Sequence, residues 1–210
     1  MAHATGERLG VLGGTFDPVH VGHLVAAVNA RAALDLDTVL LVVANQPWQK
    51  SGRVLTPAGD RMAMVEAAVA GVDGLEASRL ELDRGGPTYT ADTLEQLVAV
   101  DPDRELFLIV GADVAADLST WERPDVVARL ATLAVVGRGG VGDSADLRLS
   151  PMWRVEHVEI PRLEISSSDI RRRCAAGLPL DFLVPQPVIT RIRALGLYAG
   201  GTMPTPSGGR

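Results

Sequence analysis

The chain has 210 residues, a formal net charge of −6 at pH 7 and a single cysteine. The acidic balance argues against a broad nucleic-acid-binding surface, and the longest apolar run is far too short to span a membrane. One cysteine cannot form an internal disulfide, so a reducing, cytoplasmic location is expected. The length predicts a single domain over residues 1–200, and residues 201–210 are expected to be a disordered tail.

The first half of the chain alternates short apolar runs with helical patterns. Runs of valine and leucine predict buried strands, and apolar residues spaced three and four apart predict helices. Thr56 can cap a helix whose first turn suits Pro57. In chain order the expected elements are a strand at 8–12, a helix at 21–34, a strand at 38–44, a loop at 45–55, a helix at 56–70, a strand at 75–82, a turn at 83–87 and a helix at 90–100.

The second half continues this alternation. Its expected elements are a strand at 106–110, a helix at 123–130, a strand at 132–136, a mobile loop at 139–150, a strand at 155–160 and helices at 166–176 and 186–195. Strands that alternate with helices predict βαβ units. We therefore expect an α/β fold, a Rossmann-like doubly wound and mostly parallel sheet, with a small helical C-terminal part at about 166–198.

Glycines and polar residues follow several of the expected strands directly. Ligands of doubly wound sheets bind beyond the carboxyl ends of the strands, where such residues share one edge. The sequence therefore predicts one site there. Its candidate residues are Gly13, Gly14, Asn45, Gly111, Asp113 and Arg138.

The segment 13–23 reads Gly-Gly-Thr-Phe-Asp-Pro-Val-His-Val-Gly-His, at an expected strand-to-helix turn. Glycines let the backbone approach an anion closely, and free amides at a helix N-terminus bind it. His20 and His23 are three residues apart, so both imidazoles face the same way on a helical turn. The segment is neither a Walker loop nor a dinucleotide fingerprint, because it lacks Gly-Lys-Ser/Thr and the required glycine spacing. It predicts a phosphate site lined by two histidines.

A second phosphate-binding pattern lies at 165–173, Ile-Ser-Ser-Ser-Asp-Ile-Arg-Arg-Arg. Serines at a helix start can cap the helix and offer hydroxyl and amide groups to phosphate oxygens. An arginine one turn later can clamp distal phosphates. Taken alone, the segment is more simply a capped helix with a solvated basic face. Together with the two histidines it favours a nucleotide site.

These two motifs resemble those of the nucleotidylyltransferase superfamily, and more narrowly those of the bacterial nicotinate-nucleotide adenylyltransferases. The resemblance runs from about residue 8 to 198. Further segments that carry it are Pro-Thr-Tyr-Thr-Ala-Asp-Thr-Leu at 87–94, Gly-Ala-Asp at 111–113 with the later Trp121, Val-Pro at 184–185 and Leu-Tyr at 197–198.

The resemblance implies transfer of the AMP moiety of ATP to nicotinate mononucleotide, which gives nicotinate adenine dinucleotide and pyrophosphate. The catalytic residues would be His20, His23 and Arg171. The implied ATP contacts are Gly14, Thr15, Phe16, Gly111, Asp113, Ser167 and Ser168. The implied mononucleotide contacts are Asn45, Lys50, Thr90, Trp121 and Arg138.

The sequence departs from the family in three places. The loop 47–50 reads Pro-Trp-Gln-Lys where the family often has Pro-Pro-His-Lys, although Lys50, the only lysine of the chain, is kept. Ser168 stands where threonine is common. Glu122 follows the tryptophan, and its carboxylate would repel a nicotinate carboxylate, so we expect its side chain to point away.

No nucleophile constellation is present, which favours direct in-line transfer by positioning and charge stabilisation. Mg²⁺ is expected to arrive on the ATP phosphates, without a protein metal site. The expected partners are ATP and nicotinate mononucleotide, with no nucleic acid and no membrane, and a homo-oligomer is left open. Alternatives are a related transferase that acts on nicotinamide mononucleotide, phosphopantetheine, glycerol phosphate or riboflavin phosphate, and a non-catalytic nucleotide-binding module.

Overall fold

A sheet of six parallel strands forms the centre of the molecule within residues 6–47, 55–137 and 149–199, the part of the chain that the computed structural model describes. Its strands are β1 (Arg8–Gly14), β2 (Thr38–Val43), β4 (Leu75–Ser78), β6 (Glu105–Gly111), β7 (Ala131–Gly137) and β8 (Val155–Glu159). Two further strands, β3 (Gln46–Pro47) and β5 (Pro87–Thr88), pair in parallel beside it.

The order across the main sheet is β4-β2-β1-β6-β7-β8, and all the pairings are parallel. Counted along the chain, this is the doubly wound order 3-2-1-4-5-6. The winding direction reverses between β1 and β6. The predicted α/β Rossmann-like fold is therefore confirmed, and its crevice is expected beyond the carboxyl ends of those two strands.

Helices cover both faces of the sheet. They are α1 (Val21–Ala33), α2 (Ala58–Val69), α3 (Leu80–Arg84), α4 (Thr90–Val100), α5 (Ala112–Ala116), the 3₁₀ turn η2 (Leu118–Thr120), α6 (Pro124–Leu130), α7 (Ser167–Ala175) and α8 (Gln186–Ala194). None of the helices in the described ranges is long and apolar enough to cross a membrane.

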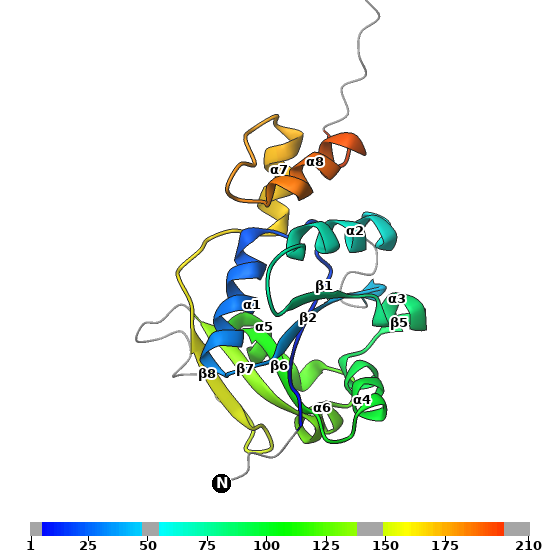
Figure 1. Ribbon diagram of the computed structural model, residues 1–210, viewed down its shortest axis with the longest axis vertical. Helices are drawn as coiled ribbons and strands as arrows, with labels where there is room; N and C mark the ends of the chain where they lie inside the picture. Colours follow the sequence, from blue (N-terminus) through cyan, green and yellow to red (C-terminus); the bar gives the residue numbers. More distant parts are fainter. Residues whose placement is uncertain (1–5, 48–54, 138–148, 200–210) are drawn as a thin grey trace, which may run out of the picture.

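The core has one layer on each side of the sheet. Along β6, Phe107 and Ile109 belong to the core layer that also contains residues of α1, α2, α7 and α8. Leu106, Leu108 and Val110 belong to the layer that contains residues of α4, α5 and α6. This alternation follows from the two-residue period of a strand that is buried on both faces. Figure 1 shows α7 and α8 beyond α1 and α2, at one end of the molecule.

The predicted strand at 75–82 is wrong in its second half, because β4 ends at Ser78. Gly85 N–H donates to the Glu81 carbonyl and Asp83 N–H to the Arg79 carbonyl, so residues 80–84 form α3 instead. The two-strand ladder β3–β5 and the helical turns over 112–120 were not predicted. The helices expected at 166–176 and 186–195 are confirmed to within one residue at each end. The predicted tail at 201–210 and most of the loop at 139–150 lie outside the described residues.

Candidate active site

The histidine segment, residues 13–23, begins with the last two residues of β1, next to the point where the winding of the sheet reverses. Gly14 is the last residue of β1, and its carbonyl accepts from Ala44 N–H at 2.9 Å. A Cβ at Gly14 would lie 2.8 Å from the Phe16 ring, so only glycine fits there. Gly111, the last residue of β6, caps α5, and Asp113 is exposed in the first turn of that helix. The predicted glycines therefore lie at the carboxyl ends of β1 and β6, where the winding of the sheet reverses.

His20 and His23 stack against each other at the start of α1. Their ring centroids are 3.7 Å apart and the ring planes differ by 22°. His20 N–H donates to His23 Nδ1 at 3.2 Å, so the neutral His23 ring carries its proton on Nε2. The Phe16 ring meets His23 edge-on at 5.0 Å. The expected juxtaposition of the two imidazoles is thus present in the structure.

The His20 imidazole is buried and neutral. It is 6 % exposed, and within the described ranges its Nδ1 has no hydrogen-bond partner. Burial lowers its pKa from 6.5 to about 4. A neutral imidazole keeps one N–H donor and one acceptor nitrogen, which suits it to hydrogen-bond a polar ligand.

This burial predicts a pH-dependent stability. From pH 6.5 down to about pH 4, the unfolded chain binds a proton at His20 that the folded chain does not, so stability falls as the pH falls. We expect His20 to lower the free energy of unfolding by about 2 kcal/mol between pH 7 and pH 5. Urea unfolding of the wild type and His20→Gln at both pH values measures this. The variant should lose that dependence, whereas His157→Gln, at an exposed position in β8, should keep it. Equal pH dependence in wild type and His20→Gln would contradict the assignment.

Helix α7 docks directly on the histidine segment. Ser167 Oγ donates to the Pro18 carbonyl at 2.9 Å, and Arg171 Nη1 donates to the Asp17 carbonyl at 2.6 Å. Arg171 Nη2 also donates to Ser168 Oγ at 3.1 Å. The helix start is stabilised by Ser166, whose Oγ accepts from the backbone N–H three residues later. Two motifs separated by about 150 residues are thereby brought into contact.

A buried carboxylate next to these contacts was not singled out from the sequence. Asp17 is 4 % exposed, and the Tyr198 hydroxyl donates to its Oδ1 at 2.6 Å. Thr56 Oγ1 donates to the Tyr198 hydroxyl at 3.1 Å. Burial, and then the hydrogen bond to Asp17, raise the pKa of Tyr198. The histidine segment is therefore held from α7, from the start of α2 and from the segment after α8.

Arg61, which was also not singled out from the sequence, is 1 % exposed inside α2. It donates to the carbonyls of Thr15 at 2.7 Å, Ala44 at 2.8 Å, Thr56 at 2.9 Å and Asn45 at 3.3 Å. Desolvation lowers its pKa, and the charge of nearby Asp17 opposes that shift. The signal in the sequence was an arginine on the apolar face of the expected helix at 56–70.

The predicted acceptor residues lie on β2, α4 and the turn before α6. Asn45 follows β2, Thr90 begins α4, and Trp121 packs partly against the apolar core with α4 and α6. The Trp121 Nε1 atom is buried and has no hydrogen-bond partner in the described part of the chain. Arg123 pairs with Asp92 and with Glu95 of α4 at 3.0 Å, which ties the tryptophan turn to that helix.

Glu122 is exposed, away from the core. Lys50 and Arg138 lie outside the described residues. Within the described ranges, no group of three or more histidine, cysteine or acidic side chains could hold a metal ion.

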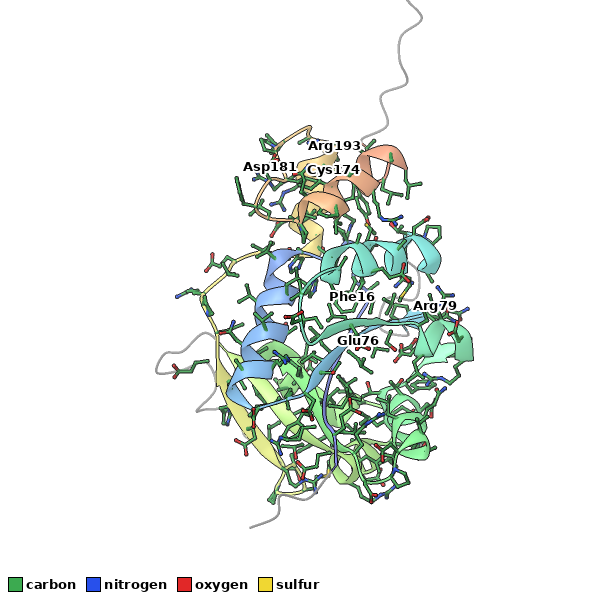
Figure 2. All side chains as sticks on the ribbon, viewed as in Figure 1. Phe16, Glu76, Arg79, Cys174, Asp181 and Arg193 are labelled. Atoms are coloured by element: carbon green, nitrogen blue, oxygen red, sulfur yellow. The ribbon has the colours of Figure 1, made fainter. Side chains whose placement is uncertain are left out.

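Cys174, in the helical part above the sheet (Figure 2), directs its thiol to the Leu197 carbonyl at 3.5 Å. Burial raises the pKa of that thiol, which makes it a poor nucleophile.

Known proteins resemble this chain over most of its length. A profile of the cytidylyltransferase-like family matches residues 11–173. A Saccharopolyspora erythraea protein is 45% identical over 194 residues, which are 92% of this chain and 91% of that protein. A Streptomyces coelicolor protein is 46% identical over 189 residues, which are 90% of this chain and 100% of that protein. Both carry the name "probable nicotinate-nucleotide adenylyltransferase".

Solved structures show the same fold. The nicotinic acid mononucleotide adenylyltransferase of Plasmodium falciparum, solved in complex with NaAD, superposes with a TM-score of 0.72 at 18% identity. The match covers 91% of this chain and 97% of that one. The chain therefore belongs to the cytidylyltransferase-like family and, within it, to the nicotinate-nucleotide adenylyltransferases.

Proposed function

We propose that this chain transfers the adenylyl group of ATP to nicotinate mononucleotide, forming nicotinate adenine dinucleotide and releasing pyrophosphate. The observation that carries the proposal is the docking of Ser167 and Arg171 on the segment that presents His20 and His23. Two phosphate-binding motifs then face one crevice at the reversal point of the sheet, where nucleotides bind in such folds.

The proposed reaction is a direct in-line displacement. A phosphate oxygen of the mononucleotide attacks the α-phosphorus of ATP, the new P–O bond forms, and the bond to the β-phosphate bridging oxygen breaks, so that pyrophosphate leaves with that electron pair. The two imidazoles donate hydrogen bonds to phosphate oxygens whose charge grows in the transition state. No covalent intermediate is required.

Each ATP contact follows from position in the fold. The backbone of the β1–α1 turn is the proposed contact to an anion at the start of α1. In α1 itself, the Val21 N–H already donates to the Leu183 carbonyl and the His23 N–H to the His20 carbonyl, both at 3.0 Å. Ser167, Ser168 and Arg171 take the β- and γ-phosphates, and Gly111 and Asp113 take the ribose side. The turn residues that contact the nucleotide through their backbone are Gly14, Thr15 and Phe16.

The acceptor is placed on the other side of the crevice. Trp121 stacks on the pyridine ring, which an indole face favours. Asn45 contacts the mononucleotide from the segment after β2, and Thr90 contacts it from the start of α4. Lys50 and Arg138 complete the proposed set, outside the described residues.

We propose that Mg²⁺ binds together with ATP, on its phosphates. The donor chemistry fits this role, because Mg²⁺ keeps several waters and is commonly held by substrate phosphates with few protein ligands. The Asp17 carboxylate, close to the α7 contacts, is already engaged by the Tyr198 hydroxyl. The cation would neutralise charge on the triphosphate, while the residues named above orient it.

We further propose that residues 1–200 form one domain and that the protein works in the cytoplasm. The proposed partners are ATP and the mononucleotide, with no nucleic acid. The proposal does not specify whether the protein is a monomer or a homo-oligomer.

Pyrophosphate release tests the proposed function. With MgATP, we expect release to depend on nicotinate mononucleotide and to be absent with phosphopantetheine, glycerol phosphate or riboflavin phosphate. A parallel reaction with nicotinamide mononucleotide measures the preference between acid and amide. Release with another phosphate acceptor in place of the pyridine nucleotides would identify a sister transferase. ATP binding without release for any acceptor would identify a non-catalytic module.

A further inference from the structure

A buried carboxylate lies next to residues that the proposed function assigns to the acceptor. Glu81, in α3, is 5 % exposed, and burial raises the pKa of its carboxyl group. Burying a carboxylate costs free energy unless hydrogen-bond donors surround it. None of the proposed contacts to ATP or the mononucleotide uses Glu81, so its place needs another explanation.

Two threonine hydroxyls hold this carboxylate. Thr93 Oγ1 donates to Glu81 Oε1 at 2.6 Å. The Thr88 hydroxyl is a second, weaker donor to the carboxylate and partly offsets the rise of its pKa. Arg84 Nη2 donates to Thr93 Oγ1 at 3.2 Å. Because a guanidinium can only donate, Thr93 accepts from Arg84 and keeps its single proton for Glu81. The carboxylate therefore accepts from both threonines.

These threonines lie on either side of the residues that lead into α4. Thr88 is in β5 and Thr93 is in the first turn of α4, so Tyr89 and Thr90 lie between them. Tyr89, at the N-cap position, makes no side-chain cap hydrogen bond. The start of α4 is therefore held from both sides by the Glu81 carboxylate rather than by a cap.

The same hydrogen bonds continue to Asn45. Its backbone N–H donates to Thr88 Oγ1 at 3.1 Å, and its Nδ2 donates to the Gly86 carbonyl at 3.0 Å. Gly85 and Gly86 both have a φ of +71°, a left-handed conformation that glycine adopts without strain because it has no Cβ. The contacts from Asn45 and Glu81 fix the position of the segment relative to β2.

We propose that Glu81 is a positioning residue for acceptor recognition, which through Thr88 and Thr93 holds Asn45 and Thr90 in the arrangement that binds the mononucleotide. This inference rests on the proposed function, since Asn45 and Thr90 are its acceptor contacts. An ionised carboxylate suits the task because it accepts from both hydroxyls at once. An amide at this place offers one acceptor and one donor group, so it cannot satisfy both in the same way.

Steady-state kinetics of Glu81→Gln with MgATP and nicotinate mononucleotide tests this. We expect the KM for the mononucleotide to rise about tenfold, because a hydrogen bond to a charged group is lost, while the KM for ATP and kcat change less than about twofold. Glu76→Gln, at an exposed position in β4 (Figure 2), should match the wild type. An unchanged mononucleotide KM, an equal rise of both KM values or a loss of kcat alone would overturn the proposal.

A second pair of variants keeps the test decisive if Glu81→Gln folds poorly. Thr93→Val removes the hydroxyl and keeps the shape, whereas Thr93→Ser keeps the hydroxyl and removes a methyl group. We expect Thr93→Val to raise the mononucleotide KM selectively and Thr93→Ser to stay close to the wild type. Equal effects of the two would show that packing matters and the hydrogen bond does not, which would overturn the proposal.

The two proposals fail in different ways. If the wild type releases pyrophosphate with nicotinate mononucleotide but the variants show no selective change, only the role of Glu81 is wrong. If the wild type uses another phosphate acceptor, the proposed function is wrong, and the same comparison made with that acceptor still decides for or against Glu81.

Discussion

His20→Ala is expected to lower kcat by roughly 10²–10³-fold while the protein stays folded. The size follows from losing one preorganised donor to a transition-state oxygen. Folding should survive because the start of α1 is also held by contacts that do not involve the His20 side chain. Val21 N–H donates to the Leu183 carbonyl, and Ser167 and Arg171 donate to the carbonyls of Pro18 and Asp17. Pyrophosphate release at saturating substrates measures the loss, and circular dichroism with thermal unfolding checks the fold.

Two comparisons make this result specific. His157→Ala, which changes an exposed histidine in β8, should keep wild-type turnover. His23→Ala should also lose activity strongly, because its ring stacks on His20 and accepts the hydrogen bond from the His20 backbone. Near-normal turnover of His20→Ala would contradict the proposal that this imidazole contacts the reacting phosphates.

Arg61→Lys is expected to lower the free energy of unfolding by about 3–5 kcal/mol. The guanidinium reaches carbonyls of the β1–α1 turn, the end of β2 and the start of α2 through separate N–H groups. An ammonium concentrates its donors at one point and leaves several of those buried carbonyls without partners. Because lysine keeps the positive charge, the loss of stability measures the contribution of the guanidinium's contact geometry. Urea unfolding at pH 7 measures it.

Arg79→Lys is the matched control. Arg79 is exposed (Figure 2) and pairs only loosely with Asp83 at 3.4 Å, a contact that lysine can also make. Its stability should therefore stay within about 0.5 kcal/mol of the wild type. A loss below about 1 kcal/mol in Arg61→Lys would mean that the carbonyl contacts contribute little to stability.

The sequence predicted those features that are set by local pattern. Buried runs such as Leu106–Val110 identify strands, and their alternation with helices leaves the doubly wound sheet as the natural fold. The position of Gly14, Asn45 and Gly111 after strands was enough to place them at one edge. The contact of α7 with the histidine segment was expected from the complementary chemistry of two phosphate-binding motifs, not from periodicity.

What could not be predicted depends on contacts between distant segments. Asp17 accepts from Tyr198, 181 residues away, and no local pattern marks that pair. From the sequence alone, Arg61 is expected to extend from the apolar face of its helix to solvent. The fold instead surrounds its guanidinium with backbone carbonyls. The segment 75–82 reads as one strand until Glu81 is seen to need burial between Thr88 and Thr93, which a helical turn provides.

The contacts of Ser167 with Pro18 and of Tyr198 with Asp17 have a consequence for the order of synthesis. On the ribosome, β1 and α1 emerge before α7 and before the segment that contains Tyr198. A growing chain can therefore form its first βαβ unit and still lack half of the proposed triphosphate site. Under the proposed function, the arrangement that holds ATP is therefore complete only after these later residues have been made and have docked on the turn between β1 and α1.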